Sequence, residues 1–299
     1  MTLQQLKYVV TVAECGNITE AAKQLFVSQP TVTSAIHDLE KEMQIVIFVR
    51  TNKGVILSED GERFLGHARQ VLEQVDLIEG IYKNDAVSKP HFAVSCQHYS
   101  FAVNAFVDVI RRFDAYQYDF TIREEQTHEI IEDVTNLKSE LGVIYLSSKN
   151  TEVLSKMLKR NELEFTELFT ATPHVFICDS HPLAKKKSIT MENLQDYPYL
   201  TYEQGEYNSQ YFSEEFVSTL DSRKNIRVRD RATLFNLIIG LNGFTVCSGV
   251  ISAELNGRNI ISKPLDVEEY MRIGIITRKG VVLSRYAREY IEALKAHCM

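Results

Sequence analysis

Residues 17–40 decide the fold of the first part of the chain and read Asn17-Ile-Thr-Glu-Ala-Ala-Lys-Gln-Leu-Phe-Val-Ser-Gln-Pro-Thr-Val-Thr-Ser-Ala-Ile-His-Asp-Leu-Glu40. Asn17, followed three residues later by Glu20, is typical of a helix start of the capping-box kind. A tight turn at Phe26-Val27 separates this helix from the next, which Ser28 caps and which carries Pro30 in its first turn. Two adjacent alanines let the helices cross closely, so the pattern predicts a helix-turn-helix.

Short polar side chains cover the outward face of the second helix of this motif, where they could reach base edges and phosphates in a major groove. Residues 45–57 then predict a two-stranded wing, with Arg50 and Lys53 flanking its tip, able to touch phosphate or the minor groove. The predicted DNA-binding residues are Ser28, Gln29, Pro30, Thr31, Thr33, Ser34, His37, Arg50 and Lys53. From periodicity alone, a plain three-helix domain with a solvated polar face remains an alternative.

Length and composition describe an ordinary globular protein of 299 residues, enough for two or three domains. The N-terminus shows no signal-peptide pattern, and no apolar run approaches the roughly 18 residues of a membrane span. Five scattered cysteines fit free thiols in a reducing compartment better than a disulfide framework. We therefore expect a cytoplasmic protein without a membrane partner.

The net charge argues against a simple electrostatic mode of DNA binding. It is −7 for the whole chain, and the first 60 residues hold five Lys and Arg against seven Asp and Glu. Nucleic-acid binders usually carry a basic surface. Any DNA contact must therefore come from locally placed groups and helix N-termini, because a general positive field is absent from the composition.

The residues quoted above resemble the helix-turn-helix of LysR-type transcriptional regulators. The resemblance continues through Ile47-Phe-Val-Arg-Thr51 and Val55-Ile-Leu-Ser-Glu-Asp-Gly61, and returns at His181-Pro-Leu-Ala184 and Gly240-Leu-Asn-Gly243. It covers essentially the whole chain and is most specific over residues 17–61. Gln44 and Val46 depart from it, because they stand where the family usually has Gly and Pro. The resemblance implies a ligand-responsive, DNA-binding transcription regulator that is not an enzyme.

A helix of about 25 residues is predicted from residue 58 to 83, and 84–90 reads as a linker. Its apolar stripe, spaced three and four apart, needs a packing partner. Packing on its own domain is one solution; the family resemblance implies a dimerisation helix instead. A homodimer, or a homotetramer built from dimers, would join two weak DNA-binding heads and favour a pseudo-palindromic double-stranded site. RNA polymerase is a conceivable further partner.

From residue 91 onward, short β-branched or aromatic runs alternate with amphipathic helices, which predicts a parallel or mixed α/β domain. The predicted strands are 91–96, 118–124, 141–146, 175–178, 199–202, 226–229, 244–247 and 271–277. The resemblance implies an effector domain with two lobes, similar to periplasmic binding proteins. The fold class is thus a multidomain α/β protein: a winged helix-turn-helix (1–57), a linker helix and hinge (58–90), and a two-lobed effector domain (91–299), with lobe I at 91–163 and 266–299 and lobe II at 164–265.

Ligands in such folds sit at the carboxyl ends of strands, often at helix N-termini. Polar side chains at these points suggest a small anionic or zwitterionic metabolite, although each hydroxyl alone could be an ordinary helix cap. The predicted effector-binding residues are Gln97, His98, Ser100, Phe101, Gln126, Thr127, Tyr145, Thr201, Tyr202 and Thr245.

Other chemistry finds little support in the sequence. The eight histidines show no tight metal-ligand spacing, and we find no nucleophile elbow, P-loop or dinucleotide fingerprint. We therefore expect no metal, no cofactor beyond the effector and no catalytic residues. Cys96 and Cys247 end strands near the predicted cleft, where buried structural thiols are favoured over a sensing role. The alternative function is a cytoplasmic solute-binding or enzyme module with a helical N-terminal extension.

Overall fold

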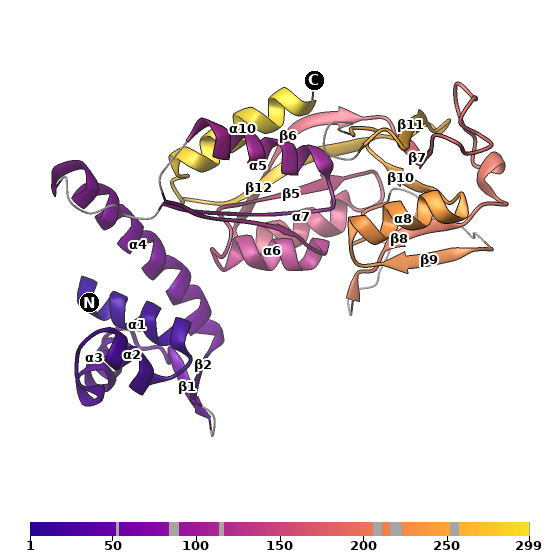
Figure 1. Ribbon diagram of the computed structural model, residues 1–299. Helices are drawn as coiled ribbons and strands as arrows, with labels where there is room; N and C mark the ends of the chain where they lie inside the picture. Colours follow the sequence, from indigo (N-terminus) through magenta and orange to yellow (C-terminus); the bar gives the residue numbers. More distant parts are fainter. Residues whose placement is uncertain are drawn as a thin grey trace. The chain divides into compact units, whose positions relative to one another are not determined.

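The computed structural model describes residues 1–51, 54–83, 90–113, 117–205, 211–215, 223–251 and 257–298 (Figure 1). The main division into two compact units falls between Pro90 and His91. Lys53, predicted to flank the wing tip, and the predicted linker up to residue 89 lie outside the described residues.

The first unit begins with three helices, α1 (Leu3–Cys15), α2 (Ile18–Gln24) and α3 (Gln29–Met43). Asn17 caps α2 by accepting from the backbone N–H groups of Thr19 and Glu20 at 2.8 and 3.2 Å. Ser28 caps α3 through Thr31 N at 3.3 Å. Both predicted helix starts are therefore confirmed. The buried faces of the helices share one core that includes Val9, Val12, Ala21, Ala22, Val32, Ile36 and Leu39.

The predicted wing is an antiparallel pair, β1 (Phe48–Thr51) and β2 (Gly54–Leu57). It is fastened to the turn between α1 and α2, because Val55 N donates to Gly16 O at 3.0 Å. Gly54 permits this approach: its φ is +141°, and a Cβ there would lie 2.3 Å from Gly16 O. The helix-turn-helix and the base of the wing thus form one body.

Gln44 ends α3 in the left-handed conformation, with φ 57° and ψ 36°. Its backbone N–H donates to Glu40 O and so closes the last turn of the helix. Glycine adopts this conformation without a Cβ penalty, which explains why the resembling family usually has Gly here. The departure at Gln44 leaves the fold intact and introduces local backbone strain.

The long helix is α4 (Glu59–Lys83), close to the predicted 58–83. Its first half packs on its own unit, where Leu65 and Ala68 are buried. Further along, Val71 and Ile78 are 41% and 58% exposed. The start of the apolar stripe therefore packs within its own domain, whereas these two later positions are exposed.

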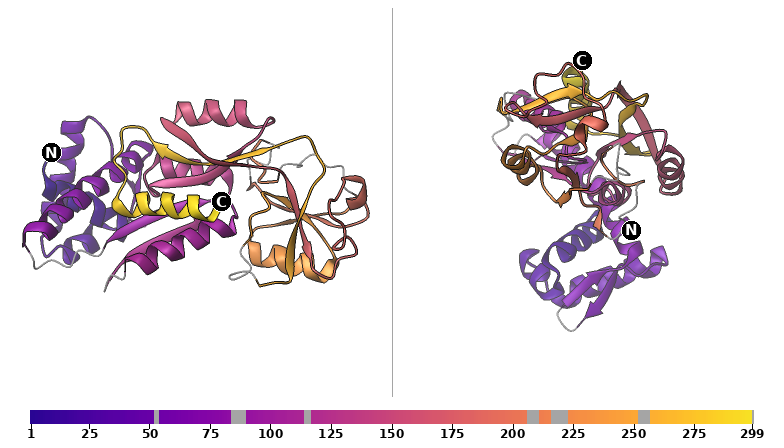
Figure 2. Two further views of the ribbon diagram at one scale, coloured as in Figure 1. Left: turned by 90° about the horizontal axis from the view of Figure 1, so that it is seen from above. Right: turned by 90° about the vertical axis from the view of Figure 1, so that its right-hand side faces the viewer.

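The first lobe of the second unit is a five-stranded mixed sheet of order β4-β3-β5-β12-β6. Strand β3 pairs in parallel with β4 and β5, whereas β12 runs antiparallel to β5 and β6. Two helices, α5 and α10, cover one face, and α6 and α7 cover the other (Figure 2). The elements are β3 (His91–Cys96), α5 (Ser100–Arg112), β4 (Asp119–Glu124), α6 (Thr127–Thr135), β5 (Leu141–Leu146), α7 (Thr151–Arg160), β6 (Leu163–Ala171), β12 (Met271–Arg278) and α10 (Arg285–Cys298).

The predicted lobe boundary between residues 163 and 164 is wrong. Residues 163–171 form β6, which no predicted strand covered and which pairs with β12 along its whole length. The first lobe therefore extends to Ala171 before the chain crosses over. The strand was missed because its polar and apolar residues alternate irregularly along an edge of the sheet.

The described residues of the second lobe form two small sheets, one α-helix and one short 3-10 helix. Strand β7 is central to a three-stranded antiparallel sheet, and β8 pairs in parallel with β9. A bridge between Tyr199 and Phe244 links the two sheets. The elements are β7 (His174–Cys178), η1 (Glu192–Leu194), β8 (Tyr199–Tyr202), β9 (Asn225–Val228), α8 (Arg231–Leu241), β10 (Thr245–Cys247) and β11 (Ile260–Pro264).

Candidate functional site

The outward face of α3 is polar and open. Most of the predicted DNA-binding side chains here are exposed: the cap Ser28 and, on α3, Gln29, Pro30, Thr31, Ser34 and His37. Thr33 is half-buried. Gln29 Nε2 donates to Thr33 Oγ1 at 3.1 Å, so these two side chains are already oriented on adjacent turns. An amide supported in this way can present its remaining groups to a base edge.

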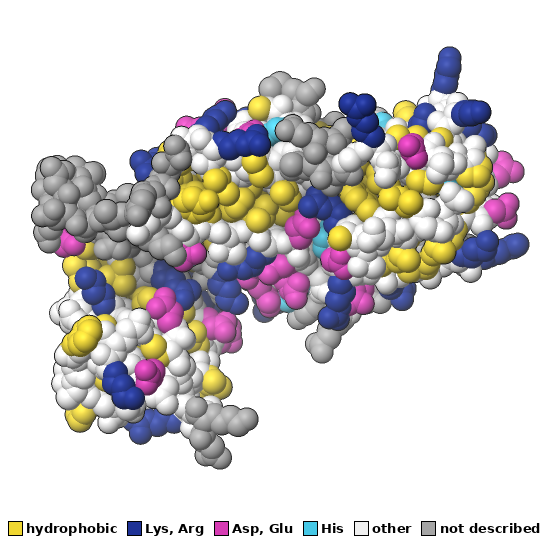
Figure 3. All heavy atoms as spheres, in the orientation of Figure 1, with side chains coloured by type: hydrophobic (Ala, Val, Ile, Leu, Met, Phe, Trp, Pro, Cys, Tyr) yellow, Lys and Arg dark blue, Asp and Glu magenta, His cyan; other side chains and the backbone are white. Residues whose placement is uncertain are grey.

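Arg50 lies on β1 and is exposed, as a phosphate contact requires. Over the face drawn in Figure 3, acidic and basic side chains are interspersed on both units. This mixed distribution agrees with the net charge of −7.

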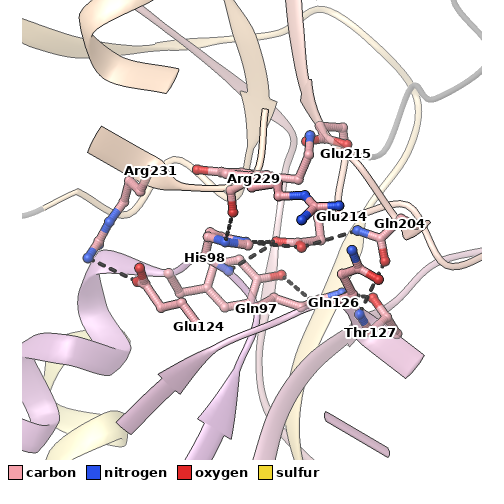
Figure 4. Close-up of polar contacts among 12 residues, drawn as sticks. Gln97, His98, Glu124, Gln126, Thr127, Gln204, Glu214, Glu215, Arg229 and Arg231 are labelled. Atoms are coloured by element: carbon pink, nitrogen blue, oxygen red, sulfur yellow. Dashed lines mark hydrogen bonds and ion pairs between the residues drawn. The ribbon is translucent and has the colours of Figure 1, made fainter. Parts of the chain in front are cut away.

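In the second unit, Gln97 organises the ends of three strands (Figure 4). Its Oε1 accepts from Tyr145 N and from Tyr99 OH, both at 3.0 Å. Its Nε2 donates to Thr127 Oγ1 at 2.7 Å. Three of the predicted effector-binding residues, Gln97, Thr127 and Tyr145, are thus brought together by direct hydrogen bonds.

His98 is paired with a carboxylate from the other lobe, that of Glu214. The distance from His98 Nδ1 to Glu214 Oε2 is 2.9 Å, and the two side chains are 4% and 5% exposed. The His98 backbone N–H donates to the same oxygen at 3.0 Å. His98 Nε2 lies 3.1 Å from Arg229 O. A carbonyl and an ionised carboxylate only accept, so the contacts of the two ring nitrogens fit the imidazolium form, in which both donate.

The electrostatic surroundings of His98 agree with this assignment. Burial lowers the pKa of His98, but the charge of Glu214 and its hydrogen bond raise it by more, with a further contribution from Glu124, so the net shift is upward. Glu124 in turn forms an ion pair with Arg231, the first residue of α8, at 2.9 Å. Charged groups therefore join the two lobes at this point.

The segment Tyr211–Glu215 supplies further bonds across the lobes. Thr127 Oγ1 donates to Phe212 O at 2.8 Å, and Tyr145 OH donates to Ser213 O at 3.0 Å. Gln204 bridges the set: its Oε1 accepts from Thr127 N at 3.2 Å, and its Nε2 donates to Glu214 Oε1 at 3.2 Å. The first lobe is therefore held to residues 212–214 by the hydroxyls of Thr127 and Tyr145 and by the ring and backbone N–H of His98.

Glu215 is a second buried carboxyl in this segment, 2% exposed. Its Oε1 accepts from Tyr202 N at 2.7 Å and its Oε2 from Ser213 Oγ at 3.0 Å. Burial, together with the nearby charge of Glu214, raises its pKa to about 8. Glu215 is therefore largely protonated at neutral pH, whereas Glu214 serves as the partner of the His98 cation.

The remaining predicted effector-binding residues divide into several groups. Tyr202 stacks on His98, and Gln126 lies at the N-terminus of α6 beside Thr127 (Figure 4). Ser100 Oγ donates to Val250 O at a long 3.5 Å, and Thr201 lies half-buried on β8. Phe101 lies in the first turn of α5, and its ring packs in the core against Tyr99 and Phe169, so its side chain does not line a cleft.

Three hydroxyls of the second lobe are buried without a hydrogen-bond partner among the described residues. They are Tyr199 OH, Thr245 Oγ1 and Ser262 Oγ, and Tyr199 and Thr245 are only 1% and 4% exposed. Burial, followed by the charge of Glu215, raises the pKa of Tyr199 well above its usual value. Unsatisfied buried hydroxyls are costly, and a bound polar ligand would satisfy them.

Sequence reasoning missed Gln204, Glu214 and Glu215. The glutamates lie between β8 and β9 in a part of the sequence where no periodicity marks a side chain as buried. A pair of adjacent acids normally indicates a solvated loop. Their role is visible only once the fold brings residue 214 beside residue 98.

The thiols near the cleft are not activated. Burial, followed by the charge of Glu124, raises the pKa of Cys96 well above the usual value, and burial also raises that of Cys247. A low pKa and exposure mark reactive cysteines, and neither thiol has both properties. Within the described ranges, no group of three His, Cys, Asp or Glu side chains could hold a metal ion. None of the helices described here is long and apolar enough to cross a membrane.

Comparison with known proteins identifies both units. Residues 3–62 match the family model described as "Bacterial regulatory helix-turn-helix protein, lysR family", and residues 94–299 match "LysR substrate binding domain". The chain belongs to the LysR family of transcriptional regulators. The uncharacterized HTH-type transcriptional regulator YbhD of Escherichia coli is 27% identical over 98% of this chain and 90% of its own.

Other members of the LysR family are more distant but cover the full length. OxyR of Escherichia coli is 22% identical over 99% of this chain and 95% of its own. A solved full-length OxyR variant from Pseudomonas aeruginosa matches with a TM-score of 0.65 at 22% identity, over 99% of this chain and 98% of that one. The LysR family regulator CbnR matches with a TM-score of 0.55 at 18% identity over both full chains. These structures support the fold: helix-turn-helix, linker helix and two-lobed domain. The predicted family, fold class and regulatory, non-enzymatic function are thus confirmed.

Proposed function

We propose that this LysR-type regulator binds a pseudo-palindromic promoter site as a homodimer, with one α3 helix in the major groove of each half-site. The helix-turn-helix itself carries DNA binding, as the family match over residues 3–62 establishes. The exposed polar face from Gln29 to His37 supports direct base readout, and Arg50 supports backbone contact. DNA lies in the bacterial cytoplasm, where we place the protein.

Dimerisation is proposed on the exposed apolar positions of α4. Val71 and Ile78 lie seven residues apart, two helical turns along one side of the helix. A second copy of α4 would cover them. Joining two heads raises the effective affinity of a DNA-binding surface whose own net charge is unfavourable. Pairing of dimers into tetramers and contact with RNA polymerase are further proposals of the same scheme.

The effector is proposed to be a small anionic or zwitterionic metabolite bound between the two lobes. The observation that carries this proposal is the convergence of His98, Thr127 and Tyr145 from the first lobe with Tyr202 and residues 212–214 from the second. Binding there would shift the equilibrium between different arrangements of the two lobes. This shift would change how the two DNA-binding units of the dimer contact the promoter.

A mobility-shift assay on the promoter upstream of the protein's own gene tests the proposal. We expect a shift that survives excess random DNA and that changes when the correct metabolite is added. Absence of any shift at low salt, with and without a metabolite panel, would overturn it. Turnover of a metabolite without DNA affinity would instead favour the solute-binding or enzyme alternative.

A further inference from the structure

The groups of the first lobe that could bind an effector are already bonded to the chain's own residues 212–214. Tyr145 OH and Thr127 Oγ1 donate to two backbone carbonyls of this segment. The ring and the backbone N–H of His98 bind the Glu214 carboxylate. Figure 4 shows Glu214 and Gln204 directed at His98 and Thr127. The segment thus makes the contacts that a bound carboxylate ligand would make.

We propose that Phe212–Glu214 is a tethered occupant of the effector cleft, and that the effector is a small carboxylate that replaces the Glu214 carboxylate on His98. This inference rests on the proposed effector function of the cleft and names its chemical class. A carboxylate is required because the position offers three donors: two from His98 and one from Gln204 Nε2. A neutral ligand would leave the His98 cation buried beside the interlobe surface without an anion.

The tether sets the strength of the competition. A covalently attached carboxylate acts at an effective concentration in the millimolar range, so a free carboxylate with the same contacts must exceed that concentration or make additional ones. The buried hydroxyls of Tyr199 and Thr245, which lack partners among the described residues, are available for such additional contacts. Displacement of the segment also releases Phe212 and Ser213 from the first lobe, which links ligand binding to the contact between the lobes.

Hydrogen–deuterium exchange on the full-length protein tests the inference with acetate as the probe. In Glu214→Ala, we expect the amide of His98 to exchange about tenfold faster or more, as loss of one charge-assisted hydrogen bond implies. Added acetate should restore the protection, whereas acetamide, which has the same shape without the charge, should not. Glu152→Gln removes one exposed carboxylate on α7 and is the matched control, with wild-type exchange expected.

Unchanged exchange in Glu214→Ala, or fast exchange that acetate does not reverse, would overturn the inference. If Glu214→Ala fails to fold by circular dichroism, Glu214→Gln replaces it. The tethered amide then competes more weakly, so acetate should bind this variant at least about tenfold more tightly than wild type, and equal affinity would overturn the inference. Operator binding by the wild-type protein is measured in the same preparation. This measurement tests the proposed function separately. If Glu214 does not occupy the effector cleft, the protein would still bind its operator.

Discussion

The ring of Tyr202 stacks on the imidazole of His98 with centroids 3.8 Å apart and an interplanar angle of 7°. One ring follows β3 of the first lobe and the other ends β8 of the second. The stack fixes the plane of the imidazole, so that Nδ1 faces Glu214 and Nε2 faces Arg229 O. A cation over an aromatic ring is also favoured electrostatically. Aromatic packing and ion pairing therefore support the same protonation state of His98.

His98 should titrate above an ordinary histidine. Burial opposes this shift, but the Glu214 carboxylate outweighs it, so the pKa of His98 is raised from 6.5. The contribution of the pair to stability is complete below pH 6.5 and is lost as the pH rises through the raised pKa. NMR titration of the imidazole measures this directly. Glu214→Gln should lower the pKa of His98, whereas Glu152→Gln should not; equal values in all three proteins would contradict the assignment.

Glu215 makes the effector domain less stable as the pH rises. The unfolded chain ionises this carboxyl near pH 4.5, whereas the folded protein retains the proton up to about pH 8. Between these values the folded state binds the extra proton, so stability falls by up to about 1.4 kcal/mol per pH unit. Urea unfolding at several pH values should show this slope in wild type and a flatter one in Glu215→Gln. A slope that persists in the variant would assign it to other groups.

The roles of α3 and the wing can be separated by specificity. Gln29→Ala should reduce discrimination between operator and random DNA, with a loss of about 1–3 kcal/mol on the operator, because it removes a base-edge contact. Arg50→Ala should weaken both DNAs alike and reduce the dependence of affinity on salt, because a phosphate contact carries no sequence information. Fluorescence anisotropy on both DNAs distinguishes the two patterns. Parallel losses on both DNAs for both variants would refute the division of roles.

The apolar side of α4 should be needed for dimerisation. Val71→Lys places a charge at a position that is 41% exposed in one chain. In a dimer that position would be buried, where an unpaired charge is strongly unfavourable. Sedimentation should show at least about tenfold weaker self-association, accompanied by weaker operator binding. Val282→Lys, at an 81% exposed site in the second unit, is the matched control; equal behaviour of the two variants would exclude α4 as the interface.

Gln44→Gly should stabilise the DNA-binding unit by about 0.5–1 kcal/mol, because glycine adopts the left-handed conformation without a Cβ clash. Thermal unfolding of the full chain measures the change. Gln70→Gly makes the same substitution inside α4 and should destabilise by about 1 kcal/mol. If both substitutions destabilise, the left-handed conformation at residue 44 costs less than the flexibility that glycine adds to the unfolded chain.

The sequence predicts the first unit almost completely because its signals are local. Helix caps at Asn17 and Ser28 act within three residues, and the buried stripe of each helix repeats within one element. Strand β6 was missed for the opposite reason. It is an edge strand whose partner, β12, lies about a hundred residues further along the chain, so its pairing leaves little trace in its own composition.

The candidate effector site was predicted in part, and the limit is again the range of the signal. Positions after strands were identified from their place in the βα order, which placed Gln97, His98 and Thr127 correctly in one cluster. Phe101 was assigned to the site because it lies where a helix opens after the first strand, although its ring faces the core. Glu214 could not be found, because its burial depends on a partner 116 residues away.

The hydrogen bond between Val55 and Gly16 has a consequence for signalling. It holds the wing against the turn between α1 and α2, where the two backbones lie too close together for any side chain at residue 54. A winged helix-turn-helix held together by this bond resists a change of its internal conformation when a ligand binds far away. In the dimer proposed above, an effector would therefore act by changing the spacing or tilt of two intact DNA-binding units. Regulation would then be sensitive to the number of base pairs between half-sites.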